Sequence, residues 1–297
     1  MQGVEGATKR PKRKNGGQMT NRIAFQGALG AYSHEACTTA RKELDPLPCP
    51  SFEDMIEAVL EGRADHAMVP VENSTYGRVA DIHRLLPESG LHIIDEAFTR
   101  VRICLMANSG TRLQDVKSVR AHLVLLPQAK TFLDQHGIAP ISAADSAGAA
   151  AELASTPNPA IGVLASSIAA YTYNLKILAK DIEDHSHNTT RFLIMSRTPD
   201  YSRRAHGKMI TTFVFQVRNI PASLYKAMGG FATNGVNMLK LESYMLEGSF
   251  TATQFYADVE GHPEDENVKL ALEELEYFST SIKVLGVYPA DSHRSRY

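Results

Sequence analysis

Short apolar runs alternate with amphipathic windows through the first two thirds of the chain, from Arg22 to about Arg197. Runs such as 23–25 and 66–71 have the length and composition of buried strands, and 52–60 places its apolar residues at helical spacing. This alternation predicts an α/β fold with largely parallel strands. Two lobes joined by crossing strands fit the length of the region.

A polar segment that contains a proline, residues 198–204, separates this region from a second pattern. The predicted elements that follow are a strand at 210–217, a helix at 222–234, strands at 238–245 and 251–259, a helix at 266–278 and a strand at 282–288. That βαββαβ order is typical of a ferredoxin-like fold. We therefore divide the chain into a tail at 1–20, an α/β unit at 21–198, a linker at 199–208, a second domain at 209–290 and a tail at 291–297.

Composition narrows the classes of function. The 297 residues are 43% hydrophobic, enough for more than one core. Lys and Arg number 31 against 33 Asp and Glu, a formal net charge of −2. A net charge this close to zero gives no overall electrostatic attraction to nucleic acid or to a membrane surface, so we expect a small-molecule partner instead.

Cysteine use and the N-terminal segment bear on the compartment. Cys37, Cys49 and Cys104 form no CxxC pair, which argues against a disulfide framework and a structural zinc site. No apolar run approaches the ~20 residues that span a bilayer, and the basic stretch at 9–14 lacks a signal peptide's apolar core. We expect a cytoplasmic protein with a solvated, disordered basic tail.

The first candidate for chemistry is Thr190 beside Arg191, just before the apolar run 193–195. A hydroxyl next to a guanidinium at a strand entrance can donate a proton or a hydrogen bond while the cation holds an anion. By itself this pair is also consistent with a threonine at a strand edge and a surface arginine.

The second candidate is the segment 69–77, where Asn73 and Ser74 follow a buried strand. Exposed backbone N–H groups and these two side chains could bind a carboxylate, but for this segment alone helix capping by Asn73 or Ser74 is the better explanation. The turn at 27–30 likewise delivers a strand to a polar helix start. Ligands bind at such strand ends in open α/β sheets.

Four motifs in fixed order together resemble the prephenate dehydratase family across nearly all of residues 22–290. The motifs are FQGALGAYSHEA at 25–36, VPVENSTYGRV at 69–79, AADSAGAA at 143–150 and NTTRF at 188–192. The resemblance implies a two-lobed, periplasmic-binding-protein-like catalytic domain. A further family block, SHPQALAQC, keeps only its His and Gln here, as His122 and Gln128.

The resemblance also implies roles for single residues. It makes Thr190 the catalytic hydroxyl and Arg191 an anchor for a substrate carboxylate. The other implied substrate-binding residues are Gly30, Ser33, Asn73, Ser74, Gln128 and Phe192. His185 and His187 flank the motif, but histidines at i and i+2 without a third ligand make a poor metal site, so we expect solvated loop residues and no metal.

The implied reaction is the decarboxylating dehydration of prephenate to phenylpyruvate in L-phenylalanine biosynthesis. Aromatisation drives the reaction, so no cofactor is expected. The enzyme needs only groups that position the carboxylates of the substrate, help for the departing hydroxide and a shielded pocket. An arogenate dehydratase would use the same chemistry. A non-enzymatic two-lobed binding protein is the other alternative, but it would have no need of Thr190.

Residues 209–290 resemble an ACT domain, a module that senses amino acids at subunit interfaces. Residues 219–224 correspond to the family's PGAL segment and 241–245 to its IESRP segment, each imperfectly. Backbone N–H groups at 222–224 could hold an effector carboxylate, and Asn237 could meet its ammonium. The implied effector-binding residues are Asn219, Ala222, Ser223, Leu224, Asn237, Glu242 and Ser243.

The partners implied by this resemblance are prephenate, L-phenylalanine as an allosteric effector, and further copies of the chain in a homodimer or homotetramer. A domain that only dimerises is the alternative, since such a sheet can also bury apolar surface between subunits.

Overall fold

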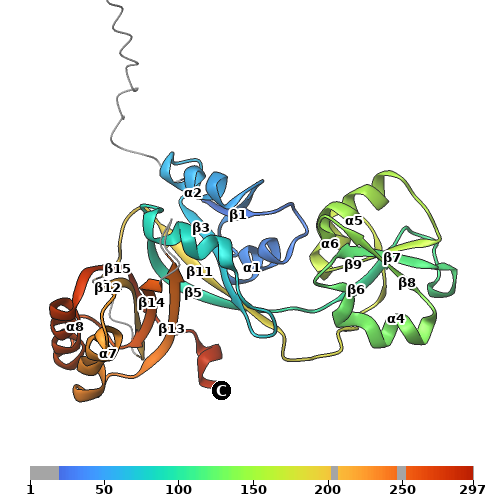
Figure 1. Cartoon of the computed structure of the whole chain (residues 1–297). Helices are drawn as coiled ribbons and strands as arrows, with labels where there is room; N and C mark the ends of the chain where they lie inside the picture. The colour runs from blue at the N-terminus through green and yellow to red at the C-terminus, as the bar shows by residue number, and fades with distance from the viewer. Residues whose placement is uncertain (1–19, 202–206, 246–251, 297) are drawn as a thin grey trace, which may run out of the picture.

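The computed structural model describes residues 20–201, 207–245 and 252–296. Figure 1 shows three bodies in a row: a first lobe in the middle, a second lobe on one side and a C-terminal domain on the other. The predicted basic tail lies outside the described residues apart from Thr20, and so do residues 202–206 of the predicted linker.

Lobe 1 is a mixed sheet with helices against it. Its strands are β1 (Arg22–Gln26), β2 (Asp45–Cys49), β3 (His66–Asn73), β5 (His92–Arg100) and β11 (Thr189–Ser196), in the order β5-β11-β3-β1-β2. Its helices are α1 (Tyr32–Ala40), α2 (Phe52–Leu60) and α3 (Ala80–Leu85), and a 3-10 turn, η1 (Leu86–Glu88), follows α3. A short strand, β4 (Gly77–Arg78), pairs with the end of β3 to form a hairpin.

Lobe 2 has a five-stranded sheet in the order β10-β6-β9-β7-β8. The strands are β6 (Cys104–Ala107), β7 (Ser118–His122), β8 (Ala139–Ala143), β9 (Ile161–Ala165) and β10 (Lys176–Ala179). The helices are α4 (Lys130–His136), α5 (Ser146–Ser155) and α6 (Ser167–Thr172), with 3-10 turns η2 (Leu113–Asp115) and η3 (Leu126–Ala129).

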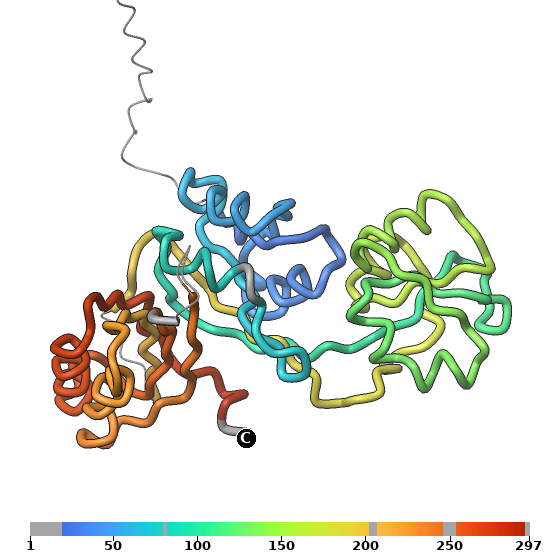
Figure 2. Tube along the Cα trace, in the orientation of Figure 1, coloured from blue at the N-terminus to red at the C-terminus, as the bar shows by residue number. Residues whose placement is uncertain are grey.

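The chain enters lobe 2 after β5 and returns to lobe 1 at β11, so two segments cross between the lobes (Figure 2). This confirms the predicted two-lobed α/β architecture. Parallel pairing holds for β1 with β2 and β3, and for β7 with β8 and β9. By contrast, β11 runs antiparallel to both of its neighbours because the returning segment enters the sheet from the opposite end.

The C-terminal domain has the predicted βαββαβ order. Its elements are β12 (Met209–Val217), α7 (Ser223–Thr233), β13 (Met238–Met245), β14 (Ala252–Glu260), α8 (Glu266–Phe278) and β15 (Ser279–Pro289). The antiparallel sheet has the order β13-β14-β12-β15, and side chains of α7 and α8 share one core with it. This confirms the ferredoxin-like prediction.

The sheets of lobe 1 and the C-terminal domain join through one parallel pair, Gly286 with Ile93. A Cβ at Gly286 would overlap the carbonyl oxygen of Ile93, so glycine permits this backbone approach. Residues 291–296, predicted as a tail, include the 3-10 turn η4 (Ser292–Arg296) and lead back toward lobe 1 (Figure 2). There the backbone N–H of Asp291 donates to Glu96 on β5 at 3.0 Å.

Candidate active site

A cleft of about 650 Å³ lies between lobes 1 and 2. Its walls include residues 26–28 and 31–33 of lobe 1 and 144–147 of lobe 2. These segments contain the first residues of α1 and of α5, and Asp145 caps α5 by accepting from the backbone N–H of Gly148 at 2.6 Å. Because helix N-termini present unpaired N–H groups and a partial positive charge, both walls favour anions.

Of the residues predicted in the first motif, Ser33 lines this cleft, whereas Gly30 packs behind it. Gly30 has φ +93°, and a Cβ there would lie 3.1 Å from the Cα of Ala169 on α6. The backbone N–H of Gly30 donates to His34 Nδ1 at 2.9 Å. The glycine therefore serves the close approach of the two lobes.

Hydrogen bonds bridge the lobes around the cleft. Ser166 donates to Glu35 at 2.5 Å, and Tyr173 to the carbonyl of Leu29 at 2.6 Å. The hydroxyl of Tyr76 donates to the carbonyl of Val124 at 3.1 Å. These bonds hold α1 and the β3–β4 hairpin of lobe 1 to lobe 2.

Thr190 is held by Asn73, so the two candidate motifs meet in the fold. The amide nitrogen of Asn73 donates to Thr190 Oγ1 at 3.0 Å and to Asn188 Oδ1 at 2.7 Å. The amide oxygen of Asn73 accepts from the backbone N–H groups of Thr75 and Tyr76. Since Thr190 Oγ1 accepts this bond, its own proton points elsewhere and can be donated.

Gln128 of lobe 2 joins the same network through Asn188. Asn188 Nδ2 donates to Gln128 Oε1 at 2.5 Å, while Gln128 Nε2 donates to the carbonyl of Val124 at 2.8 Å. Asn188 is only 2% exposed. Asn188 was not among the predicted site residues, although it stands two residues before Thr190 in the NTTRF motif and so shares its face of an extended chain.

Ser74 fastens the β3–β4 turn to β11. Its hydroxyl donates to the carbonyl of His187 at 3.1 Å and accepts from the backbone N–H of Thr189 at 2.9 Å. Its backbone N–H donates to the carbonyl of Thr189 at 2.8 Å. These bonds fix the turn that carries Asn73, so Ser74 acts on the site through the backbone.

Arg191 points away from this network, because successive side chains of a strand point to opposite faces. It is 2% exposed, and four of its five N–H groups donate to groups around it. The acceptors are Glu96 and Glu72 at 2.9 Å, Asp258 at 2.7 Å and the hydroxyl of Tyr288 at 2.9 Å. The predicted role of Arg191 as a carboxylate anchor in the cleft therefore finds no support in this geometry.

Phe192 does not face the cleft either. It is 1% exposed and packs in the lobe 1 core with Ile23, Phe25 and Cys37. The structure thus makes the last residue of the motif part of the core under β11, and the prediction of a substrate contact is not supported.

Six charged side chains gather where lobe 1 meets the C-terminal domain, and we call them the interdomain charge cluster. The cations are Arg191, Lys240 and Arg294, and the anions are Glu72, Glu96 and Asp258. Burial alone would raise the pKa of Asp258, but the charge of Arg191 and a hydrogen bond from Thr212 outweigh it and hold that pKa below its usual value. The cluster is balanced in charge, as buried ions require.

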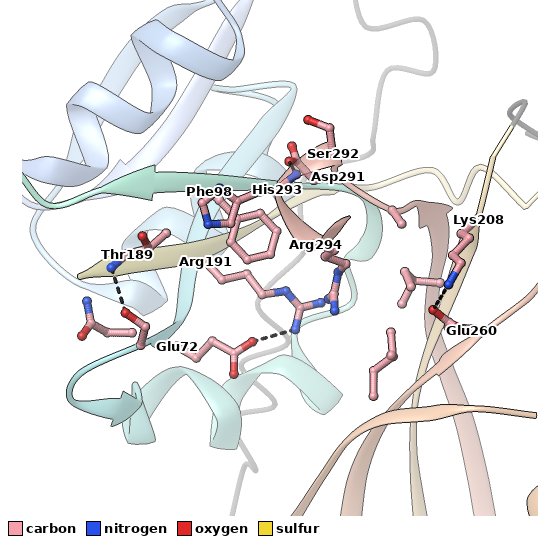
Figure 3. Close-up of a pocket in the computed structure, with 15 residues that line it drawn as sticks. Glu72, Phe98, Thr189, Arg191, Lys208, Glu260, Asp291, Ser292, His293 and Arg294 are labelled. Atoms are coloured by element: carbon pink, nitrogen blue, oxygen red, sulfur yellow. Dashed lines mark hydrogen bonds and ion pairs between the residues drawn. The ribbon is translucent and has the colours of Figure 1, made fainter. Parts of the chain in front are cut away.

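A second cavity of about 590 Å³ lies beside this cluster, between lobe 1, the C-terminal domain and residues 290–294 (Figure 3). Its apolar wall comes from Phe98, Ile210, Leu239 and Ala290. Asn73, Ser74, Thr189 and Arg191 are also among its lining residues, whereas the half-buried Thr190 is among those of neither this cavity nor the interlobe cleft.

The predicted effector residues lie on the surface of the C-terminal domain. Asn219, Ala222 and Asn237 are exposed, while Ser223 and Leu224 are half-buried at the start of α7. Ser243 is exposed on β13, the edge strand. Glu242 turns toward lobe 1, with one carboxylate oxygen 3.8 Å from Arg78 and the other 3.8 Å from Lys240.

Two further properties concern only the described part of the chain. Within residues 20–201, 207–245 and 252–296, no three His, Cys, Asp or Glu side chains are grouped so as to hold a metal ion. His185 and His187 are exposed, with ring centroids 5.7 Å apart. None of the helices in these ranges is long and apolar enough to cross a membrane.

Comparison with known proteins places this geometry in a family. The family model described as prephenate dehydratase matches residues 23–200. A bifunctional N-acyl-homoserine lactone acylase/prephenate dehydratase of Komagataeibacter europaeus is 48% identical over 92% of this chain and 98% of its own length. Arogenate dehydratase 2 of Petunia hybrida is 35% identical, over 91% of this chain and 72% of its own.

A solved structure agrees with both sequence comparisons. Prephenate dehydratase of Arthrobacter aurescens, in complex with L-Phe, superposes with a TM-score of 0.82 at 28% identity, covering 91% of this chain and 90% of that one. The family model covers more than half of the chain, and the relatives cover both the lobes and the C-terminal domain. The chain belongs to the prephenate dehydratase family.

Proposed function

We propose that the chain converts prephenate to phenylpyruvate, carbon dioxide and water in L-phenylalanine biosynthesis. The observation that carries this proposal is the Thr190 hydroxyl, held as an acceptor by Asn73 in a network that reaches Gln128 in the second lobe. The carboxylate on the ring leaves as carbon dioxide, and its bonding electrons complete the aromatic ring. The ring hydroxyl departs at the opposite carbon and takes up a proton.

Thr190 supplies help for that departing oxygen. Its Oγ1 accepts from Asn73, so the hydroxyl proton is directed away from the amide. In this proposal it is donated to the departing oxygen of the substrate. A threonine hydroxyl is a weak acid, so its proton moves only as the C–O bond breaks, by donation or by relay. A fixed donor of this kind stabilises charge that develops in the transition state without reorganisation.

The interlobe cleft suits the two carboxylates of prephenate. The N-terminal residues of α1 and α5 line opposite walls of the cleft, and Ser33 lies on the first of these walls. Backbone N–H groups at the two helix ends can each take one carboxylate. In this proposal they take the place of Arg191, whose donors are occupied by the charge cluster.

The test replaces Thr190 with valine, which keeps the shape and removes the hydroxyl. We expect kcat to fall by about a hundredfold, the usual scale of a proton-transfer contribution, with little change in KM. Phenylpyruvate formation, followed by its absorbance in alkali, measures both constants. Thr172→Val on α6 is the matched control, and normal turnover by Thr190→Val would refute the role of Thr190.

Arogenate is the alternative substrate for the same machinery, and the relatives named arogenate dehydratase keep it open. The two substrates differ only in a keto or an amino group beside one carboxylate. Measuring kcat/KM for both substrates on one preparation decides between them. We expect prephenate to give the higher value, and a higher value for arogenate would reassign the enzyme.

We propose further that a catalytic domain at 21–198 is followed, after a linker at 199–208, by an ACT domain at 209–290 that binds L-phenylalanine. Support comes from the βαββαβ order, the exposed loop before α7 and the L-Phe complex of the Arthrobacter aurescens relative. ACT modules act in pairs, so we propose a homodimer or homotetramer in the cytoplasm. A monomer in analytical ultracentrifugation would contradict the paired arrangement.

A second candidate activity is hydrolysis of N-acyl-homoserine lactones, which is named for the 48% identical relative. The cavity of about 590 Å³ favours it, because Phe98, Ile210 and Leu239 offer an acyl chain an apolar wall. The test incubates the purified chain with a long-chain N-acyl-homoserine lactone and measures the free fatty acid by mass spectrometry. Release that persists in Thr190→Val would indicate a separate site, and no release would exclude the activity.

A further inference from the structure

The β3–β4 hairpin carries Asn73 at its turn, so its position decides where Asn73 meets Thr190. In the hairpin Glu72 pairs with Arg78, and Asn73 with Gly77. Asn73 reaches Thr190 from this turn through a single amide nitrogen, over 3.0 Å. A small displacement of the hairpin would therefore change the hydrogen bond to the catalytic hydroxyl.

Strand β13 of the C-terminal domain contacts both strands of this hairpin. On the β3 side, Lys240 forms an ion pair with Glu72. On the β4 side, Arg78 donates to the carbonyl of Ser243 at 3.3 Å and lies 3.8 Å from Glu242. The opposed strands of the hairpin thus have separate partners on one strand of the neighbouring domain.

Tyr244 adds a third contact, near the base of the hairpin. Its hydroxyl lies 2.8 Å from His83 Nδ1, and His83 Nε2 lies 2.9 Å from the carbonyl of Val71. The guanidinium of Arg78 sits over the Tyr244 ring, 5.6 Å from its centroid. Side chains 240, 242 and 244 share one face of β13, which is the face toward lobe 1.

The same strand carries residues of the proposed effector site. Ser243 lies on β13 between two of these contacts, and its side chain is on the exposed face. The strand is also the edge of the sheet, so in the described residues its other side pairs with no strand. One strand therefore leaves one face exposed and turns the other face toward the Asn73 hairpin.

We propose that β13 positions the Asn73 hairpin, with Lys240 and Tyr244 as positioning residues, so that a ligand bound at β13 changes the placement of Asn73 against Thr190. This inference rests on the proposed binding of L-phenylalanine by the C-terminal domain. The ligand class is an amino acid bound at the edge strand.

The test compares the wild-type chain with the double variant Lys240→Met, Tyr244→Phe. The matched control is Lys269→Met, Tyr277→Phe, which alters the same residue types on the exposed face of α8. Calorimetry gives L-phenylalanine binding, and hydrogen exchange measured by mass spectrometry follows the peptide at 70–79. Turnover with and without saturating L-phenylalanine gives the functional response.

In the wild type and the control, we expect L-phenylalanine to change both the exchange of peptide 70–79 and the turnover, the latter by at least about fivefold, a typical allosteric coupling. In the double variant, we expect binding to persist while both responses shrink, the change in turnover to less than about twofold. Equal responses in the double variant and the wild type would overturn the proposal. So would wild-type binding that leaves peptide 70–79 unchanged.

Failure of the proposed function gives different signals. A chain that forms no phenylpyruvate still reports the coupling through hydrogen exchange. Absence of L-phenylalanine binding in the wild type would remove the effector site and overturn this inference as well. If the double variant does not fold, Tyr244→Phe alone removes one hydroxyl from the link and is read in the same way.

Discussion

Thr190 and Arg191 are neighbours in sequence, but their side chains lie on opposite faces of β11 and contact different groups. Thr190 meets Asn73 on one face of β11, and Arg191 meets Glu72, Glu96 and Asp258 on the other. The guanidinium is suited to its place because it stays charged when buried and offers donors in several directions. The motif therefore combines the hydroxyl that we propose as the proton donor with the cation that joins its strand to the next domain.

At this scale we predict that Arg191→Met mainly destabilises the fold. It would leave three carboxylates near one another without their central cation, a loss of about 3–5 kcal/mol in the free energy of unfolding. Urea denaturation followed by circular dichroism measures it. Arg112→Met, which breaks an exposed pair with Asp115 in lobe 2, should leave the stability nearly unchanged. A raised KM with normal stability would instead restore the role of Arg191 as a substrate anchor.

Among the elements, α7 begins with a residue in an unfavourable conformation. Ala222 precedes the helix as its N-cap and has φ +63°, in the left-handed region. In the proposed ACT domain it corresponds to the glycine of the PGAL segment. A Cβ in this region costs free energy that glycine avoids. The start of α7, where we place the effector carboxylate, therefore holds its shape against a local preference.

We predict that Ala222→Gly raises the free energy of unfolding by up to about 1 kcal/mol, because relief of strain exceeds the added entropy of the unfolded chain. The matched control is Ala232→Gly, an exposed position inside α7, which should lower it by a similar amount. Thermal or urea unfolding measures both. A destabilising Ala222→Gly would show that the methyl group makes contacts worth more than the strain.

For the whole molecule, the junction between lobe 1 and the C-terminal domain combines a shared core with the charge cluster. Ile210 and Tyr256 of the C-terminal domain pack in one cluster with Val69 and Ile93 of lobe 1. Arg294 adds a bond from the C-terminal segment to Glu96 at 2.6 Å. The domains are thus attached over a packed interface as well as through the linker.

Because of this junction, we expect the free energy of unfolding to depend on pH in the acidic range. Burial raises the pKa of Glu72 and of Asp258, but Arg191 and neighbouring donors outweigh it in both, and each net pKa lies below the usual 4.5 and 3.8. A lowered folded pKa gives stability that is complete above these values and is lost as pH falls below them.

We therefore predict that the urea midpoint falls as pH is lowered from about 6 to about 3, and that Asp258→Asn flattens this dependence. Denaturation curves at several pH values measure it. Other paired carboxylates contribute to the wild-type slope, so the difference between the two proteins is the informative quantity. Parallel curves for the two would mean that Asp258 is not held ionised by the cluster.

The sequence alone determined the elements and their order. The strand and helix ranges of the C-terminal domain agree with those observed to within a few residues, because hydrophobic periodicity and turn residues are local signals. The order of the motifs was sufficient to identify the family and to select both Asn73 and Thr190. The fold then joins these two residues by a hydrogen bond. The period of two of a strand is also enough to put Thr190 and Arg191 on opposite faces.

Only the tertiary structure decided which groups contact each face of β11. Arg191 meets Asp258 from 67 residues away, and Gln128 reaches Asn188 across 60. Such contacts depend on how the lobes and the C-terminal domain pack, and neither strand periodicity nor the charge of a side chain specifies its partner. For that reason the sequence could single out Thr190 as a candidate reacting group but not foresee that Arg191 is buried among Glu72, Glu96 and Asp258 where lobe 1 meets the C-terminal domain.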